Sequence, residues 1–234
     1  GLLIPKTSSR AITSPAGTAD TMETLAPVEL TAQQMHRVVE QEGGCIAWGG
    51  AVSLSPVDDL LIRVERPLGL DSDGLLVASI LSKKASAGAT HVLIDMPVGR
   101  TAKVRSPEAA AILAARLVEV ARSLGMVLRV QMSDGAQPVG RGIGPALEAF
   151  DVLAVLQNHG GAPEDLRQRA LALAAGLLEL AGKASQGAGM AMASAALESG
   201  AAWRKIQAIC AAQGGMREPP RAAFTQPLCA LHAG

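Results

Sequence analysis

Lys6-Thr-Ser-Ser-Arg-Ala-Ile-Thr-Ser-Pro-Ala-Gly-Thr-Ala-Asp-Thr-Met-Glu23 is the stretch of this chain on which the interpretation of the fold depends. It is rich in Thr and Ser and holds almost no bulky apolar side chain. Because buried hydroxyls need partners, it is atypical of a core element, and we expect a polar loop entering a short helix with Thr18 or Asp20 as N-cap. Hydroxyls beside a helix N-terminus favour an anion such as phosphate. An ordinary surface loop is the alternative, and composition leaves both open.

The composition of the whole chain narrows the class of protein. Apolar residues make up 49% and aromatic residues 2% of 234 residues, so the core must consist of Ala, Leu, Val and Ile. A chain of this length fits one large domain or slightly more. Lys plus Arg and Asp plus Glu number 21 each, and this balance gives no support to a nucleic-acid or membrane-surface partner.

Metal sites, disulfides and membrane spans find no support in the sequence. The cysteines lack a Cys-x-x-Cys pair and the histidines are scattered, which predicts reduced thiols in a cytoplasmic protein without a zinc or other metal site. No apolar run is long enough to cross a bilayer. The chain begins without Met inside an apolar run, so we expect a fragment of a longer protein. The residues concerned are Cys45, Cys210, Cys229, His36, His91, His159 and His232.

The clearest α/β pattern lies in the middle of the chain. Residues 91–95 and 126–132 are expected strands, and Ser106-Pro107-Glu108 is a start signal for the helix between them. Strand, helix and strand predict a parallel pair with ligand-accessible loops at the strand ends. The second loop ends in Gly140-Arg-Gly-Ile-Gly144, which suits either an anion or a plain turn. The fold class is therefore α/β, with a three-layer lobe, a mostly parallel sheet flanked by helices, and a small helical part.

Flanking segments are predicted to be mostly helical. A capping box at Thr31 opens a helix that ends at Gly43, a short strand follows over 45–48, and helices are expected over 162–182, 189–199 and 201–213. The helix over 74–87 places Ser79 and Lys83 on one stripe, while Lys84 lies about 100° round the helix and is expected to be solvated. From the residues alone, Lys83 either serves a ligand or extends to water.

Several segments together carry a resemblance. The stretch 6–23, Ala78-Ser-Ile-Leu-Ser-Lys-Lys84, Val92-Leu-Ile-Asp-Met-Pro-Val-Gly99 and the run 126–149 resemble, in this order, the pyrimidine-nucleoside phosphorylase (thymidine phosphorylase) family. The form of the signature stretch is the one that this family shares with archaeal-type AMP phosphorylases. The resemblance covers nearly the whole chain and weakens after about Gly182.

The resemblance implies an activity and a set of site residues. The full-length protein would be a pentosyltransferase that cleaves a pyrimidine nucleoside or deoxynucleoside with inorganic phosphate as co-substrate and without another cofactor, giving free base and pentose 1-phosphate. Ser8 and Thr18 would hold phosphate. Arg63, with Arg66 as the alternative, would hold the base together with Ser79 and Lys83, and Arg63 and Lys83 would stabilise charge on the leaving base. The family further implies a homodimer.

The resemblance also implies a division of the chain. Residues 1–57 and 89–213 would form the phosphate-binding α/β lobe, 58–88 would enter a helical base-binding lobe, and 214–234 would be an irregular tail. A Lys-x-Ser phosphate loop is expected upstream of Gly1, so residues 1–234 alone are predicted to be inactive. Arg100 and Lys103 replace a Gly/Ser-rich run. They either hold a 5′-phosphate, which suggests an alternative, a nucleoside 5′-monophosphate (AMP-type) phosphorylase, or are only solvated. A non-catalytic phosphate- or nucleoside-binding module is the third hypothesis.

Overall fold

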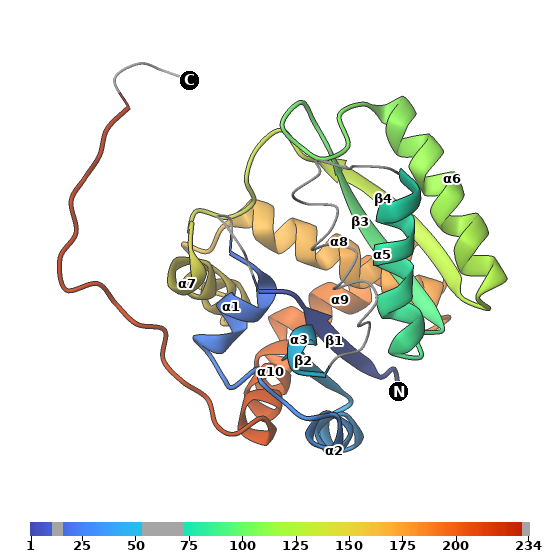
Figure 1. Cartoon of the computed structure of the whole chain (residues 1–234). Helices are drawn as coiled ribbons and strands as arrows, with labels where there is room; N and C mark the ends of the chain where they lie inside the picture. Colours follow the sequence, from blue (N-terminus) through green and yellow to red (C-terminus); the bar gives the residue numbers. More distant parts are fainter. Residues whose placement is uncertain (11–15, 53–72, 231–234) are drawn as a thin grey trace.

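The fold of the first part of the chain is a parallel strand pair with a helical connection. The computed structural model describes residues 1–10, 16–52 and 73–230. Strand β1 (Ile4–Ser8) pairs with β2 (Gly44–Trp48), with Ile4 opposite Gly44 and Ser8 opposite Trp48. Helices α1 (Thr18–Glu23) and α2 (Ala32–Glu42) lie in the connection, and the short α3 (Gly49–Val52) follows β2. Figure 1 shows β1 and β2 beside α1 and α2.

A second strand–helix–strand unit lies beside the first. Helix α5 (Asp73–Ser86) leads into β3 (His91–Val98), and α6 (Pro107–Ser123) connects β3 to β4 (Val127–Asp134). The two strands are parallel, with His91 opposite Val127 and Val98 opposite Asp134. Ser106 caps α6, since its side chain accepts a hydrogen bond from the Ala109 N–H at 3.2 Å. The predicted crossover unit is confirmed, and both strands extend beyond the predicted ends.

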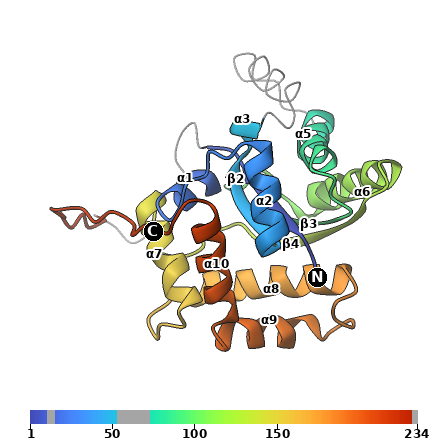
Figure 2. The same cartoon turned by 90° about the horizontal axis from the view of Figure 1, so that it is seen from below.

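The remaining helices cover the strands. They are α7 (Pro145–Leu156), α8 (Glu164–Leu180), α9 (Gly189–Glu198) and α10 (Ala201–Ala212). Helix α8 packs on β3 and β4, α9 packs on α8, and α10 contacts α2 and α9 (Figure 2). From Gln213 to Ala230 the chain has no helix or strand.

Two faces of β3 pack against different helices. Val92 and Met96 share a buried cluster with Val77 of α5 and Leu117 of α6. On the other face α8 approaches so closely that a Cβ at Gly176 would lie 3.2 Å from the Leu93 side chain and 2.9 Å from the Arg129 guanidinium. The structure thus has the expected class, short parallel sheets flanked by helices. Its strands form two separate pairs within the described residues, where the sequence suggested one sheet.

Two local predictions in the stretch 6–23 were wrong. Lys6, Thr7 and Ser8 belong to β1 and not to a loop, because their backbone groups pair with Ile46, Ala47 and Trp48. Side chains alternate between the two faces of a strand, and the polar side chains of this short strand are only partly covered. Their hydroxyls are therefore not fully buried, so a strand is compatible with this polar sequence. The N-cap of α1 is Gly17, neither Thr18 nor Asp20, although the predicted short helix is present.

The division of the chain into lobes stays a prediction. Helix α5 is the described part of the segment 58–88, and it shares the cluster of β3 and α6 through Val77 and Leu81. At the other end of the chain, the Gln213 side chain is buried and bonds to β2. It accepts from the Ile46 N–H at 2.9 Å and donates to the Pro27 and Ile46 carbonyls at 2.8 and 3.0 Å. The end of α10 is thereby fixed to the first strand pair.

Candidate functional site

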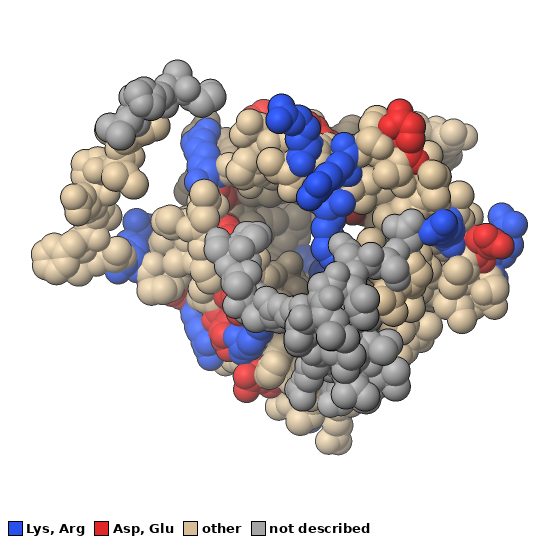
Figure 3. Space-filling model, turned by 45° about the horizontal axis from the view of Figure 1, so that its top comes forward, with Lys and Arg blue, Asp and Glu red and all other residues tan. Residues whose placement is uncertain are grey.

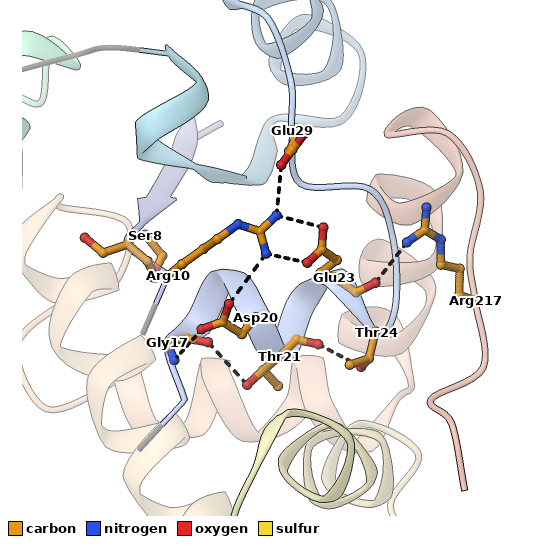
Figure 4. Close-up of polar contacts among 10 residues, drawn as sticks. Ser8, Arg10, Gly17, Asp20, Thr21, Glu23, Thr24, Glu29 and Arg217 are labelled. Atoms are coloured by element: carbon orange, nitrogen blue, oxygen red, sulfur yellow. Dashed lines mark hydrogen bonds and ion pairs between the residues drawn. The ribbon is translucent and has the colours of Figure 1, made fainter. Parts of the chain in front are cut away.

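Arg10 is the centre of a polar network at the end of β1. Its guanidinium makes a two-pronged contact with the Glu23 carboxylate, in which Nη2 lies 2.8 Å from Oε1 and Nη1 contacts Oε2 (Figure 4). Nη2 also lies 3.1 Å from Glu29 Oε1, and Nη1 lies 3.5 Å from Asp20 Oδ1. The Cζ atom stands 4.9 Å from the centre of the Trp48 ring. Arg10 therefore joins β1, α1, the segment before α2 and the end of β2.

The charges of this network reinforce one another. The hydrogen bond to Glu23 raises the pKa of the Arg10 guanidinium, and the same bond holds the pKa of the Glu23 carboxyl below its usual range. Both groups are therefore charged at neutral pH. With three carboxylates around it, Arg10 is committed to the scaffold, and its role is to hold the segment that follows Ser8 rather than to bind an anion directly.

Helix α1 has its own anchoring contacts. The Gly17 N–H donates to Asp20 Oδ2 at 2.9 Å, which closes the first turn. Thr21 Oγ1 donates to Glu148 Oε2 at 3.0 Å, while the other oxygen of Glu148 accepts from the Gly144 N–H at 3.1 Å. Helix α1 is thus tied to α7 and to the loop before it.

Both predicted phosphate residues lie beside this network. Ser8 is the last residue of β1, is half-buried and donates its hydroxyl to the Ser9 carbonyl at 3.2 Å. Thr18 is the first residue of α1 and is exposed, and β1 and α1 are in contact. The N–H groups of a first helical turn have no partner within the helix. The arrangement offers hydroxyl donors at the end of β1 and the start of α1, and N–H donors in the first turn of α1.

The predicted base-binding residues are only partly within the described chain. Ser79 and Lys83 lie on one stripe of α5 and are both half-buried. Arg63 and Arg66 lie outside the described residues. The prediction for Lys84 was wrong, because Lys84 is half-buried, and desolvation followed by the charges of Lys6 and Lys83 lowers its pKa. Lys84 follows the buried Leu81 by three residues, so it continues the buried stripe of α5.

The glycine-rich loop before α7 is a turn held by carboxylates. Gly140 N–H donates to Asp165 Oδ2 at 2.9 Å, while Arg141 N–H and Gly142 N–H donate to Asp151 Oδ2 at 2.7 and 2.6 Å. The bond from the Gly140 N–H, followed by that from the Leu166 N–H, holds the pKa of Asp165 below its usual value. The donors that would hold an anion are already occupied, so of the two interpretations left open by the sequence, the structure favours the turn.

The carboxyl ends of β3 and β4 are joined by a second network. Ser133 Oγ donates to Asp95 Oδ1 at 2.5 Å, and Arg169 Nη1 of α8 lies 3.0 Å from Asp95 Oδ2. Arg100 and Lys103 are exposed on the loop that follows β3. In the face seen in Figure 3 the surface is hollowed near its centre, with Lys and Arg side chains along the rim. Cations are therefore available around this hollow.

Sequence reasoning missed the residues that organise the site. The partners of Arg10 and Glu148 lie on separate elements, and only the register of β1 on β2 and the packing of α1 on α7 bring them together. The one available signal was the pair of acids in the short helix, Asp20 and Glu23, three residues apart and so on one face. That spacing predicts a shared cationic partner without identifying it.

Two further findings concern metals and membranes. Among residues 1–10, 16–52 and 73–230, no group of three His, Cys, Asp or Glu side chains is placed to hold a metal ion. In the same ranges, helices of a length and hydrophobicity suited to crossing a membrane were not found. Cys45 and Cys210 are buried free thiols, and Cys229 is an exposed one.

Comparison with known proteins identifies the class. Residues 1–203 match the model of the glycosyl transferase family, a/b domain, and the chain belongs to this family. It is 68% identical over 234 residues to a Polaromonas sp. protein named "Putative thymidine phosphorylase", and 64% identical to the protein of the same name from Chelativorans sp.. The Hahella chejuensis protein of that name is 68% identical over 219 residues, or 94% of this chain and 43% of the relative. The first two alignments cover all of this chain and 46% of each relative, so the chain spans about half their length.

Proposed function

We propose that the full-length protein is a pyrimidine-nucleoside phosphorylase of the thymidine phosphorylase type. It would cleave thymidine or uridine with inorganic phosphate to the free base and a pentose 1-phosphate. The observation that carries the proposal is the contact of β1 with α1, the elements on which Ser8 and Thr18 lie, held together by the bond of Arg10 to Glu23. The identity of 62–68% to proteins named "Putative thymidine phosphorylase" supports it.

In the proposed reaction, a phosphate oxygen forms a bond to the anomeric carbon while the bond from that carbon to the base nitrogen breaks. The electron pair of the broken bond leaves with the base. Ser8 and Thr18 would hold phosphate by donating hydrogen bonds, which places the attacking oxygen without a covalent enzyme intermediate. Lys83, Ser79 and Arg63 would donate to the base, and the cations gain strength as the base becomes negative. The only co-substrate in this scheme is inorganic phosphate.

A second candidate follows from the loop after β3. Arg100 and Lys103 are both exposed there, at the carboxyl end of a parallel strand, where ligands of α/β folds bind. A nucleoside 5′-monophosphate phosphorylase would use these cations for the 5′-phosphate.

The homodimer and the cytoplasmic location are likewise parts of the proposal.

The test is base release by the full-length protein from thymidine, uridine, AMP and CMP, each with and without phosphate. We expect Lys83→Ala to lower kcat by about 100-fold to 1,000-fold, as for loss of a transition-state donor. Lys183→Ala, a change at an exposed lysine, should leave kcat unchanged. A preference for AMP or CMP would favour the second candidate.

Phosphate binding without cleavage of any substrate would reject the proposed activity. If no substrate is cleaved while phosphate still raises the thermal midpoint, the protein is a binding module and not a phosphorylase. Residues 1–234 produced alone are expected to show no turnover.

A further inference from the structure

Arg169 of α8 holds the carboxyl ends of β3 and β4 together. Its Nη1 donates to Asp95 Oδ2 of β3 at 3.0 Å and to Ser133 Oγ of β4 at 2.8 Å. Its Nη2 donates to the Asp134 carbonyl at 2.7 Å, and the Ser133 hydroxyl in turn donates to Asp95 Oδ1. One guanidinium therefore bonds to three acceptors on two strands, a geometry that the planar fork of arginine allows and that lysine does not reproduce.

Helix α8 is a firm support for this arginine. The helix packs on both strands, and a Cβ at Gly176 would lie 3.2 Å from the Leu93 side chain and 3.0 Å from Gln131 Oε1. Packing this close leaves the helix little freedom to shift relative to the strands. The side chains of Arg169 and Asp95 are only 19% and 27% exposed, so water competes weakly for their contact. The position of the guanidinium is therefore set by the fold.

The two loops that follow these strand ends are in contact with each other. The Gly135 N–H donates to the Val98 carbonyl at 2.9 Å, and a Cβ added at Gly99 would lie 2.7 Å from the Gly135 carbonyl carbon. A Cβ added at Gly135 would lie 3.0 Å from the Ala102 Cβ. Glycine at both positions allows this close approach of the backbones. The loops after β3 and β4 therefore form one packed unit next to Arg169.

The loop after β3 is a closed turn that carries two cations. The Gly99 N–H donates to the Val104 carbonyl and the Ala102 N–H donates to the Gly99 carbonyl, both at 3.0 Å. Arg100 and Lys103 are exposed on this turn. Cations whose backbone is held in place bind an anionic group with a smaller loss of conformational entropy than cations on a loose loop. Whatever fixes the strand ends therefore also affects how well these two cations bind an anion.

We infer that Arg169 is a positioning residue for the 5′-phosphate of a nucleotide substrate, because it fixes the loop from which Arg100 and Lys103 reach that group. The inference rests on the second candidate of the proposed function, in which these two cations bind the 5′-phosphate. Arg169 acts through the loop and not by touching the substrate. A purely structural arginine would affect nucleotides and nucleosides alike, whereas a positioning residue for the 5′-phosphate affects nucleotides selectively.

The test compares the kinetics of full-length Arg169→Met and Arg169→Lys with the wild type, using AMP, CMP, thymidine and uridine at saturating phosphate. Arg167→Met is the matched control, because Arg167 lies on the same helix and contacts Glu198 of α9 at 3.3 Å instead of the strands. Gly99→Ala is a second variant, which disturbs the contact between the loops and leaves Arg169 in place. Urea unfolding establishes that each variant is folded.

We expect a selective effect on KM. Arg169→Met should raise KM for AMP and CMP about 10-fold to 100-fold, as for a binding group displaced from its place, and should change KM for thymidine and uridine less than about 3-fold. Arg169→Lys should lie between wild type and Arg169→Met, Gly99→Ala should show the same selectivity, and Arg167→Met should equal the wild type. In a chain that already carries Arg100→Ala and Lys103→Ala, Arg169→Met should not raise KM for AMP further, because its effect passes through those side chains.

The outcomes separate this inference from the proposed function. Equal increases in KM for nucleotides and nucleosides, or additive effects in the combined variant, would overturn the inference and leave Arg169 with a structural role. Cleavage of thymidine or uridine without cleavage of AMP or CMP would keep a phosphorylase and overturn the inference. If no substrate is cleaved, the phosphorylase is rejected and the calorimetric dissociation constant for AMP replaces KM. Weaker AMP binding by Arg169→Met would then retain the positioning role, and unchanged or absent AMP binding would reject both. Should Arg169→Met not fold, Arg169→Lys and Gly99→Ala decide by the same criteria.

Discussion

Replacing Arg10 tests whether this side chain ties the end of β1 to α1 as described. Arg10→Ala removes the two-pronged contact with Glu23 and the stack on Trp48. Because the Glu23 side chain is 39% exposed, we assign about 1 kcal/mol to that pair after solvent screening. The stack contributes about 0.5–1 kcal/mol, and the 63% exposed Glu29 adds little. The expected loss is about 2 kcal/mol.

The assay is urea unfolding of full-length Arg10→Ala and Arg10→Lys, with Arg37→Ala as the control on an exposed face of α2. A loss of this size corresponds to a fall in thermal midpoint of about 4–8 °C for a domain of 150–250 residues. Arg10→Lys should lose about half as much, because lysine keeps the charge without the two-pronged geometry. Phosphate binding should weaken in Arg10→Ala, since the link between β1 with Ser8 and α1 with Thr18 is lost.

The pH dependence of this contact has a defined sign. The pKa of Glu23 is lower in the folded protein than in the unfolded chain, mainly through its hydrogen bond to Arg10. The contact therefore stabilises the protein above about pH 4.3, the ordinary value for Glu, and its contribution disappears as the pH falls through the folded pKa. The stability difference between wild type and Glu23→Gln should be full at pH 7 and vanish in acid. Equal stability of Arg10→Ala and Arg37→Ala at pH 7 would refute the anchoring argument.

Three more predictions follow from buried and closely packed groups. Gln213→Leu leaves the Ile46 N–H without its side-chain acceptor and should cost about 2–3 kcal/mol in urea unfolding; a cost below about 0.5 kcal/mol would contradict the hydrogen-bonding role. Gly142→Ala would place a Cβ 2.4 Å from the Leu147 backbone and should lower the thermal midpoint clearly, whereas Gly160→Ala has open space and should not. Burial raises the pKa of the Cys45 thiol to about 11, so at pH 8 this thiol should resist alkylation, as read by mass spectrometry, until denaturant is added; labelling in the native protein would disprove its burial.

How far the sequence predicts this structure depends on how many residues separate the interacting groups along the chain. The capping signals at Thr31 and Ser106 act within a few residues, so the helices they open were predicted and are confirmed. The strand character of Lys6 to Ser8 depends on pairing with β2, some forty residues later, and composition alone indicated a loop. Long-range pairing overrides local preference in short polar strands.

The candidate site shows the same limit. The resemblance identified Ser8, Thr18, Ser79 and Lys83 by position, and their roles remain proposals. The contacts that organise the site connect distant parts of the chain, such as Thr21 with Glu148, and no local pattern identifies such a partner. The solvated position predicted for Lys84 rests on its angle of about 100° from Lys83 around the helix. Lys84 instead lies on the same stripe as the buried Leu81 and is half-buried.

The most direct test of the central claim is ³¹P NMR of full-length protein incubated with thymidine and inorganic phosphate. The account predicts a pentose 1-phosphate signal that grows in step with free thymine and requires added phosphate. Thymine released without a new phosphate ester, or no free base released from any of thymidine, uridine, AMP and CMP, would contradict it.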